Sequence, residues 1–206
     1  MKKNLLVCLI ILLKVFCISA SAEYKAVETD LHEAFGYVEE DRYINPFLGL
    51  EIHWPGAEYK LPPKDTEDKL ISQFVDSGDG MVLMQLKDTK DNGLYIALFQ
   101  KDQNEETVPV VQNRDDDFKA TLLDRQLLLL NSDEKNLPVL PGKIQRANIL
   151  GNSAYWIPVD YMWWGNKMHT IMIQMDQENY SVLITARSFQ NIELDDVLAV
   201  ISASSQ

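Results

Sequence analysis

The stretch that decides the fold is residues 143–187, KIQRANILGNSAYWIPVDYMWWGNKMHTIMIQMDQENYSVLITAR. Four apolar or alternating runs in it are separated by three short turns. The runs are residues 143–150, 154–164, 168–175 and 180–187. Gly151-Asn152 and Gly165-Asn166 form two of the turns, and Gly-Asn pairs tolerate the positive φ angles that two-residue hairpins require. The sequence therefore predicts an antiparallel meander in this part of the chain.

Two further strand regions precede the meander. Residues 42–54 alternate apolar and polar side chains, with Asn45-Pro46 as a turn signal, and Pro55-Gly56 ends the pattern. Residues 81–87 and 94–101 flank a polar, turn-rich stretch, which predicts a hairpin.

Three helices are predicted from apolar residues spaced three and four positions apart. The first follows Pro62-Pro63, the second opens at residues 115–117 and runs to Leu130, and the third begins near Asn191 and closes the chain. Their apolar faces are Leu70, Ile71, Phe74 and Val75; Phe118, Leu122, Leu123, Leu127, Leu129 and Leu130; and Leu194, Val197, Leu198 and Ile201. Alternating strands need one face covered, so the pattern predicts an α+β fold in which helices sandwich an antiparallel sheet.

The first 22 residues have the features of a signal peptide. Lys2 and Lys3 give a basic start, residues 5–13 are an unbroken apolar run, and Ala20-Ser21-Ala22 matches a signal-peptidase site. We therefore predict a periplasmic or secreted product that begins at Glu23. Both cysteines of the chain lie in the leader, so the mature protein would contain no thiol.

Two other interpretations of the leader stay open. A retained membrane anchor would need about 20 apolar residues, and Lys14 interrupts the run well before that length. A bacterial lipoprotein would need a small residue before the modified cysteine, whereas Phe16 precedes Cys17. After cleavage no integral membrane span is expected.

The charge of the chain restricts its partners. The formal net charge is −12, from 19 basic and 31 acidic residues, and removal of the three leader lysines makes it −15. Such a surface repels phosphate backbones and anionic lipid headgroups, which disfavours binding of nucleic acid or electrostatic binding to membranes. We predict a single domain over residues 42–206, preceded by an acidic arm at 23–41 that is helical or partly ordered.

The element order resembles that of a known family. Tyr43-Ile44-Asn45 followed by Gly49-Leu50-Glu51-Ile52-His53-Trp54-Pro55, and Tyr180 to Phe189 before the last helix, resemble the PsbP-like fold. This fold occurs in the extrinsic photosystem subunit and in exported bacterial proteins of unassigned role. Over residues 42–203 the resemblance implies a non-catalytic accessory or binding role outside the cytoplasm.

The residues that could support catalysis or metal binding form no convincing motif. His32 lacks the second histidine one turn on that a zinc protease needs, and His53 and His169 lie in strands, where histidines are usually surface residues. Residues 88–93 imitate a calcium loop, but Lys90 occupies a ligand position. We predict no catalytic residue, metal or cofactor. A hydrolase with paired carboxylates remains the alternative, because such a pair is defined in space and not in sequence.

The aromatic hairpin is the best candidate for recognition. Successive side chains of a strand point to opposite faces, so Trp163 and Trp164 cannot enter the same core. Pro158 predicts that this is an edge strand. We predict a surface for a protein or envelope component formed by Tyr161, Trp163, Trp164 and His169. In the alternative, helices cover both faces of the strand. A secreted effector that acts on a host would show the same pattern.

Overall fold

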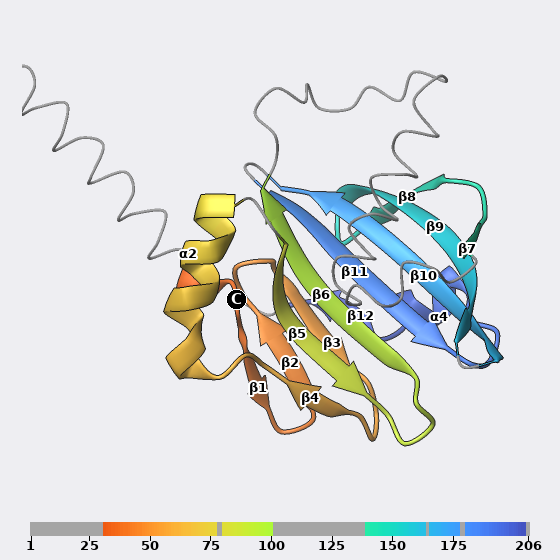
Figure 1. The fold of residues 1–206 in the computed structure, drawn as a ribbon, viewed down its shortest axis with the longest axis horizontal. Helices are drawn as coiled ribbons and strands as arrows, with labels where there is room; N and C mark the ends of the chain where they lie inside the picture. The colour runs from red at the N-terminus through yellow and green to blue at the C-terminus, as the bar shows by residue number, and fades with distance from the viewer. Residues whose placement is uncertain (1–30, 78–79, 101–138, 164, 178–179, 205–206) are drawn as a thin grey trace, which may run out of the picture.

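The computed structural model describes residues 31–77, 80–100, 139–163, 165–177 and 180–204. These residues form two antiparallel β-sheets that pack against each other, with short helices at their margins (Figure 1). The described part of the chain therefore has the α+β character that the sequence predicts.

The larger sheet contains eight strands. Its order is β4 (Glu58–Lys60), β5 (Met81–Lys87), β6 (Gly93–Gln100), β11 (Tyr180–Ser188), β10 (Asn166–Asp176), β9 (Asn152–Trp163) and β7 (Val139–Pro141), and β8 (Gln145–Ile149) also pairs with β9. The smaller sheet has the order β1 (Tyr37–Glu39), β2 (Arg42–Asn45), β3 (Leu50–His53) and β12 (Ile201–Ala203). The helices are the 3-10 turn η1 (Lys64–Thr66), α2 (Glu67–Ser77) and α4 (Leu194–Leu198).

The predicted meander is confirmed. Strands β8, β9, β10 and β11 follow one another in the chain, and each pairs antiparallel with the next. The first turn lies one residue earlier than predicted. Ile149 pairs with Asn152, and the two residues between them, Leu150 and Gly151, have φ angles of 53° and 82°. Positive φ at both central residues is what a two-residue hairpin turn needs.

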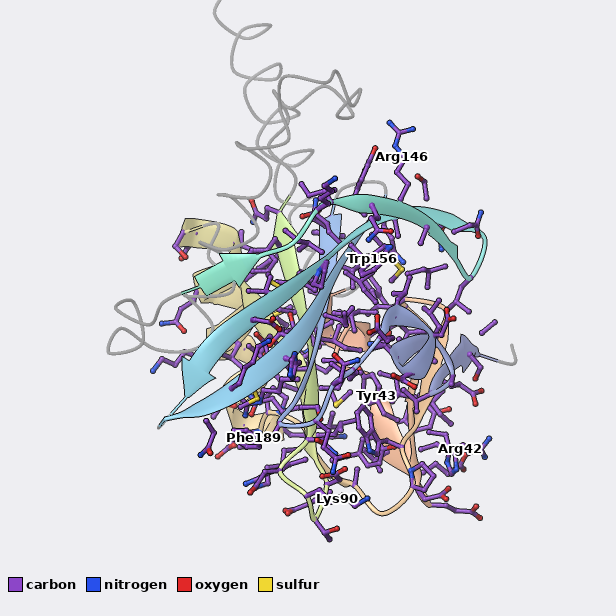
Figure 2. The ribbon with its side chains drawn as sticks, turned by 90° about the vertical axis from the view of Figure 1, so that its right-hand side faces the viewer. Arg42, Tyr43, Lys90, Arg146, Trp156 and Phe189 are labelled. Atoms are coloured by element: carbon purple, nitrogen blue, oxygen red, sulfur yellow. The ribbon has the colours of Figure 1, made fainter. Side chains whose placement is uncertain are left out.

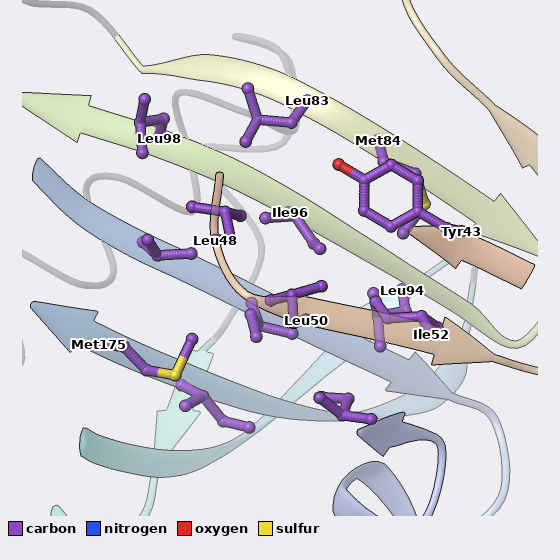
Figure 3. Close-up of a cluster of buried hydrophobic side chains, with 14 of the residues drawn as sticks. Tyr43, Leu48, Leu50, Ile52, Leu83, Met84, Leu94, Ile96, Leu98 and Met175 are labelled. Atoms are coloured by element: carbon purple, nitrogen blue, oxygen red, sulfur yellow. The ribbon is translucent and has the colours of Figure 1, made fainter. Parts of the chain in front are cut away.

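The main core lies between the two sheets. Tyr43, Leu50 and Ile52 of the smaller sheet face Leu94 and Ile96 of the larger one (Figure 3). A second cluster occupies the opposite face of the larger sheet and contains Ala97, Phe99, Ile157, Val159, Met172 and Leu183. The central strands are thus apolar on both faces, which explains their nearly continuous runs of hydrophobic residues.

Helix α2 has the apolar face that the sequence predicts. Ile71 and Phe74 are buried, and the Gln100 Nε2 donates a 2.9 Å hydrogen bond to the carbonyl oxygen of Phe74, which ties the helix to β6. The predicted helix at 115–130 lies outside the described residues. No helix within the described ranges is long and apolar enough to cross a membrane.

The predicted acidic arm differs from the structure from Leu31 onward. Leu31, Ala34 and Phe35 are buried in the main core, and β1 pairs with β2. The side-chain amide of Asn45 donates a 2.7 Å hydrogen bond to the Ala34 carbonyl. The described part of this segment therefore belongs to the domain, because it contributes apolar side chains and backbone partners that the smaller sheet needs.

The predicted closing helix is too long. Helix α4 ends at Leu198, and Ile201 begins strand β12, where it pairs with Ile52. Glu193 starts the helix in place of Asn191, because its backbone N–H donates to the Asp196 carboxylate in a capping box. Ile201 continues the helical spacing of Leu194, Val197 and Leu198 by coincidence, because it lies in strand β12.

The prediction of an edge strand at Pro158 is wrong. Strand β9 has β10 on one side and β7 and β8 on the other. Pro158 lies where the neighbour changes from β8 to β7, and its carbonyl accepts a 2.7 Å hydrogen bond from the Gly142 N–H. In an antiparallel strand the N–H and C=O of one residue point to the same side, so the missing N–H of Pro158 faces this interruption.

Candidate functional site

The β9–β10 hairpin brings the backbones of three predicted binding residues, Tyr161, Trp163 and His169, to one end of the larger sheet. The backbones of Tyr161 and Trp163 lie in β9 and pair with Met168 and Asn166, and His169 lies in β10. The side chains of Tyr161 and Trp163, and the whole of Trp164, lie outside the described residues. His169 is therefore the predicted residue whose surroundings the structure describes.

His169 forms a cluster with two residues that the sequence prediction omitted. Its Nδ1 lies 2.8 Å from Oδ1 of Asp160, and Nζ of Lys167 lies 2.8 Å from Oδ2 of the same carboxylate. His169 and Asp160 are directly opposed in the register of the hairpin. Side chains of opposed residues in an antiparallel pair lie close together on the same face. Trp163 pairs with Asn166, so counting three residues outward from this pair on each strand leads to Asp160 and His169.

The electrostatics of this cluster keep Asp160 ionised. Burial raises the pKa of Asp160, but the hydrogen bonds from Lys167 and His169 and the charges of these residues lower it more, and the net shift is downward. A carboxylate only accepts hydrogen bonds, so Nδ1 of His169 carries the hydrogen and donates it. The bond orients the imidazole ring and places Nε2 on the side away from Asp160.

Phe189 adds an exposed aromatic ring at the same end of the sheet. It follows Ser188, which pairs with His169, and 37% of Phe189 is exposed. Figure 2 shows Phe189 at this lower end of the molecule. No sequence pattern singled out Phe189, because its exposure depends on the end of β11 and the chain that follows.

The rest of β9 follows the predicted alternation. Ile157 and Val159 are buried in the second cluster, whereas Trp156 packs against the main core. In this part of the strand, side chains on both faces therefore pack against other residues, whereas the alternative in which helices cover both faces stays a prediction. The candidate surface is therefore the end of the hairpin, which we define by its described residues Asp160, Lys167, His169 and Phe189. The parts of Tyr161, Trp163 and Trp164 in this surface stay predictions.

The other two histidines contact carboxylates other than Asp160. His53 belongs to β3 of the smaller sheet and contacts Asp41. His32 contacts Glu67 through Nδ1 and Asp68 through Nε2, at 3.5 and 3.3 Å. These carboxylates approach opposite nitrogens of the ring and so do not converge on one point. Among the described residues no group of three potential ligands is arranged to hold a metal ion.

The loop that imitates a calcium site is held by hydrogen bonds. The carboxylate of Asp88 accepts hydrogen bonds from the backbone N–H groups of Lys90 and Asn92, at 2.7 and 2.9 Å, and from the Asn92 side chain at 2.8 Å. Burial raises the pKa of Asp88, but these bonds and one from the Trp54 side chain lower it overall. The aspartate organises the β5–β6 turn, as its sequence context indicates.

The comparisons with known proteins show a likeness of fold. No protein-family model matches the chain, and no curated protein matches it. The solution structure of cyanobacterial PsbP from Synechocystis sp. PCC 6803 is 12% identical, covers 82% of this chain and 96% of its own, and has a TM-score of 0.51. The chain therefore has a PsbP-like fold, as the resemblance in sequence predicted.

Two further solved structures are more distant. LpqN of Mycobacterium tuberculosis, which is involved in cell envelope biogenesis, is 13% identical over 71% of this chain and 78% of its own, with a TM-score of 0.33. A Pseudomonas aeruginosa protein of unknown function is 14% identical over 51% of this chain and 62% of its own, with a TM-score of 0.30.

Proposed function

We propose that this protein is an exported, non-enzymatic accessory protein that binds a protein or another envelope component through the end of the β9–β10 hairpin. The observation that carries the proposal is the exposed Phe189 at the end of the sheet where Asp160 holds His169 in one orientation. Aromatic side chains, Phe included, are enriched at protein interfaces. The PsbP-like fold supports an accessory role, since the cyanobacterial PsbP has the same architecture.

The hairpin end supplies two kinds of contact. Phe189 and the predicted Trp163 and Trp164 would bury apolar area against a partner, which is the dominant favourable term in most protein association. Nε2 of His169 would hydrogen-bond to the partner without a cost for orienting the ring, because Asp160 already orients it.

The binding role is tested by capture with matched variants. The mature protein is crosslinked in the extracytoplasmic fraction, and its partners are identified by mass spectrometry. Phe189→Ala, His169→Ala and Trp164→Ala should each reduce capture of the same partner with little change in melting temperature. Tyr37→Ala is the control, because Tyr37 is an exposed aromatic residue on the smaller sheet. If capture is unchanged in all three variants, the hairpin end is not the binding surface.

The proposed location is the periplasm or the extracellular space. It rests on the leader with Lys2 and Lys3 before an apolar run and on the absence of cysteine after residue 22. Cell fractionation and intact-mass analysis test it. A soluble extracytoplasmic product that begins at Glu23 is expected, whereas a chain that begins at Met1 in the membrane fraction would indicate a retained anchor.

The alternative of a hydrolase with paired carboxylates receives no support at this site. Such an enzyme needs one carboxylic acid with a raised pKa as proton donor. The pKa of Asp160 is lowered, which is the opposite direction, and so is the pKa of Asp88 in the β5–β6 turn.

A further inference from the structure

Among the described strands, β8 has an unpaired outer edge, which lies at the opposite end of the molecule from Phe189. It pairs with β9, and in the described part of the chain no second strand pairs with it. Gln145, Arg146 and Asn148 are exposed. Figure 1 shows β8 at the margin of the larger sheet, and Figure 2 shows Arg146 projecting away from the rest of the molecule. An exposed edge strand offers unpaired backbone groups to another chain.

The register identifies which backbone groups are free. Ile149 and Asn152 close a two-residue hairpin, and such a closing pair is hydrogen-bonded. Hydrogen-bonding residues alternate along an antiparallel strand, so Ala147 and Gln145 also bond to β9. The N–H and C=O groups of Arg146 and Asn148 therefore point outward from the sheet.

This edge is cationic although the protein is strongly acidic. From residue 136 to residue 159 the chain contains Lys143 and Arg146 but neither Asp nor Glu, whereas the whole chain has 31 acidic residues. The Arg146 guanidinium lies 5.6 Å from the centre of the Tyr155 ring. Across the described residues, neither Lys143 nor Arg146 pairs with a carboxylate. Both cations are therefore available to a negatively charged partner.

We propose that the β8 edge is a second binding surface, distinct from the hairpin end, that takes an extended acidic segment of a partner protein as an added antiparallel strand. The outward groups of Arg146 and Asn148 would supply the main-chain hydrogen bonds, and carboxylates of the partner would lie opposite Lys143 and Arg146.

Charge and backbone chemistry select this occupant over two others. A second copy of β8 would bring another Arg146, with Lys143 two residues before the strand, to the contact, and like charges on paired strands are destabilising. A nucleic acid has no peptide backbone, so it cannot pair with the outward N–H and C=O groups and extend the sheet. An acidic polypeptide segment satisfies both the cations and the free backbone groups.

A labelled peptide tests the proposal on the mature protein. The probe is a fluorescein-labelled synthetic peptide that alternates Glu and Val, and the control probe alternates Lys and Val. Fluorescence anisotropy at low salt should show binding of the acidic probe alone. In heteronuclear NMR spectra, titration with it should shift the amide resonances of Arg146 and Asn148. Failure of the acidic probe to bind, or equal binding of both probes, would overturn the proposal.

Two variants separate strand addition from simple attraction of charges. Asn148→Pro removes an outward N–H and leaves the ladder with β9 complete, so the affinity for the acidic probe should fall strongly. Arg146→Glu should weaken binding by roughly fivefold or more, as opposed charges become like charges. If Arg146→Glu weakens binding but Asn148→Pro, with an unchanged fold, does not, the strand-addition proposal is wrong.

A matched control uses the other edge of the same sheet. Lys60 is an exposed cation on the edge strand β4, and Lys60→Glu makes the same change of charge away from β8. The Lys60→Glu variant should bind the acidic probe with the same affinity as the unaltered protein. A loss of affinity as large as that of Arg146→Glu would mean that net charge alone, and not the β8 edge, governs binding. Phe189→Ala should also leave this affinity unchanged, so the test is independent of the proposed hairpin surface.

Discussion

A buried hydrogen-bond network joins the N-terminal part of the domain to strand β2, and removing one hydroxyl group tests its importance. The Tyr43 hydroxyl donates a 3.0 Å hydrogen bond to the Phe35 carbonyl and accepts a 2.6 Å bond from the Asn45 side chain. The same side chain donates to the Ala34 carbonyl and accepts a bond from the Leu48 N–H. Tyr43→Phe keeps the ring and removes the hydroxyl group.

The expected cost follows from the two lost hydrogen bonds. Each contributes about 0.5–1.5 kcal/mol, and a buried carbonyl left without a donor costs about 1–3 kcal/mol. Asn45 keeps its bond to Ala34, so its amide is not wholly unsatisfied. Tyr43→Phe should therefore lower the free energy of unfolding by about 2 kcal/mol. For a chain of this size that corresponds to a fall of about 4–8 °C in Tm.

The measurement is urea unfolding of the mature protein, followed by tryptophan fluorescence and far-UV circular dichroism. Tyr37→Phe is the matched control, since Tyr37 is 47% exposed and its change should cost less than about 0.5 kcal/mol. If Tyr43→Phe costs no more than Tyr37→Phe, the network does not stabilise the fold, and the packing of residues 31–36 on β2 has to be explained by apolar contacts alone.

Three other substitutions test the backbone, the core and the hairpin end. Gly36 and Gly56 both have positive φ angles, 62° and 73°, but a Cβ at Gly36 would lie 2.5 Å from the Ile44 carbonyl oxygen and one at Gly56 would meet nothing within 4 Å. Gly56→Ala should therefore lower the free energy of unfolding by about 1–2 kcal/mol, and Gly36→Ala should lower it clearly more. Equal urea midpoints for the two variants would contradict the predicted clash of a Cβ at Gly36 with the Ile44 carbonyl oxygen. Ile184→Ala in the fully buried core should cost about 2–5 kcal/mol in the same assay, and a cost below about 1 kcal/mol would mean that the core there is loosely packed. The pKa of Asp160 in the folded protein is lowered below its ordinary 3.8, so the ionised carboxylate stabilises the fold above pH 3.8, and this contribution is lost as the pH falls through the folded pKa. The difference in unfolding free energy between the unaltered protein and Asp160→Asn should therefore become smaller in acid. A difference that does not change with pH would be inconsistent with the ion pairs.

The meander was predictable because its signals are local. Period-two alternation and turns that need a positive φ act over a few residues, and these signals were correct for β8 to β11. The first turn shifted by one position because Leu150 adopts a φ of 53° and Asn152 begins β9. A residue with a side chain occupies the positive-φ position there, which a search for Gly-Asn pairs overlooks.

Ile201 shows why a periodic pattern was ambiguous. Leu194, Val197 and Ile201 are spaced as a helical stripe, yet Ile201 pairs with Ile52 in the smaller sheet. Three residues are too few for alternation to reveal a strand. Strand β12 forms because the edge of β3 that β2 leaves free offers backbone hydrogen-bond partners. The C-terminal sequence alone carries no information about this edge.

The sequence identified only part of the candidate site, again because pairing between strands is not visible in a local pattern. The prediction selected His169 from residue type and a strand pattern, but Asp160 and Lys167 contact one another only through the register of the hairpin. Phe189 depends on where β11 ends. The types of residue therefore identified the hairpin region, whereas the pairing of β9 with β10 identified the cluster of Asp160, Lys167 and His169.

The sequence by itself determined the strands of the meander, the β5–β6 hairpin, helix α2 and the acidic charge, since each arises from neighbouring residues. The tertiary structure decided that residues 31–39 join the domain and that the C-terminal strand completes the smaller sheet. These features depend on contacts between segments far apart in the chain, where the loss of conformational freedom is offset by burial and hydrogen bonds that neither segment makes alone.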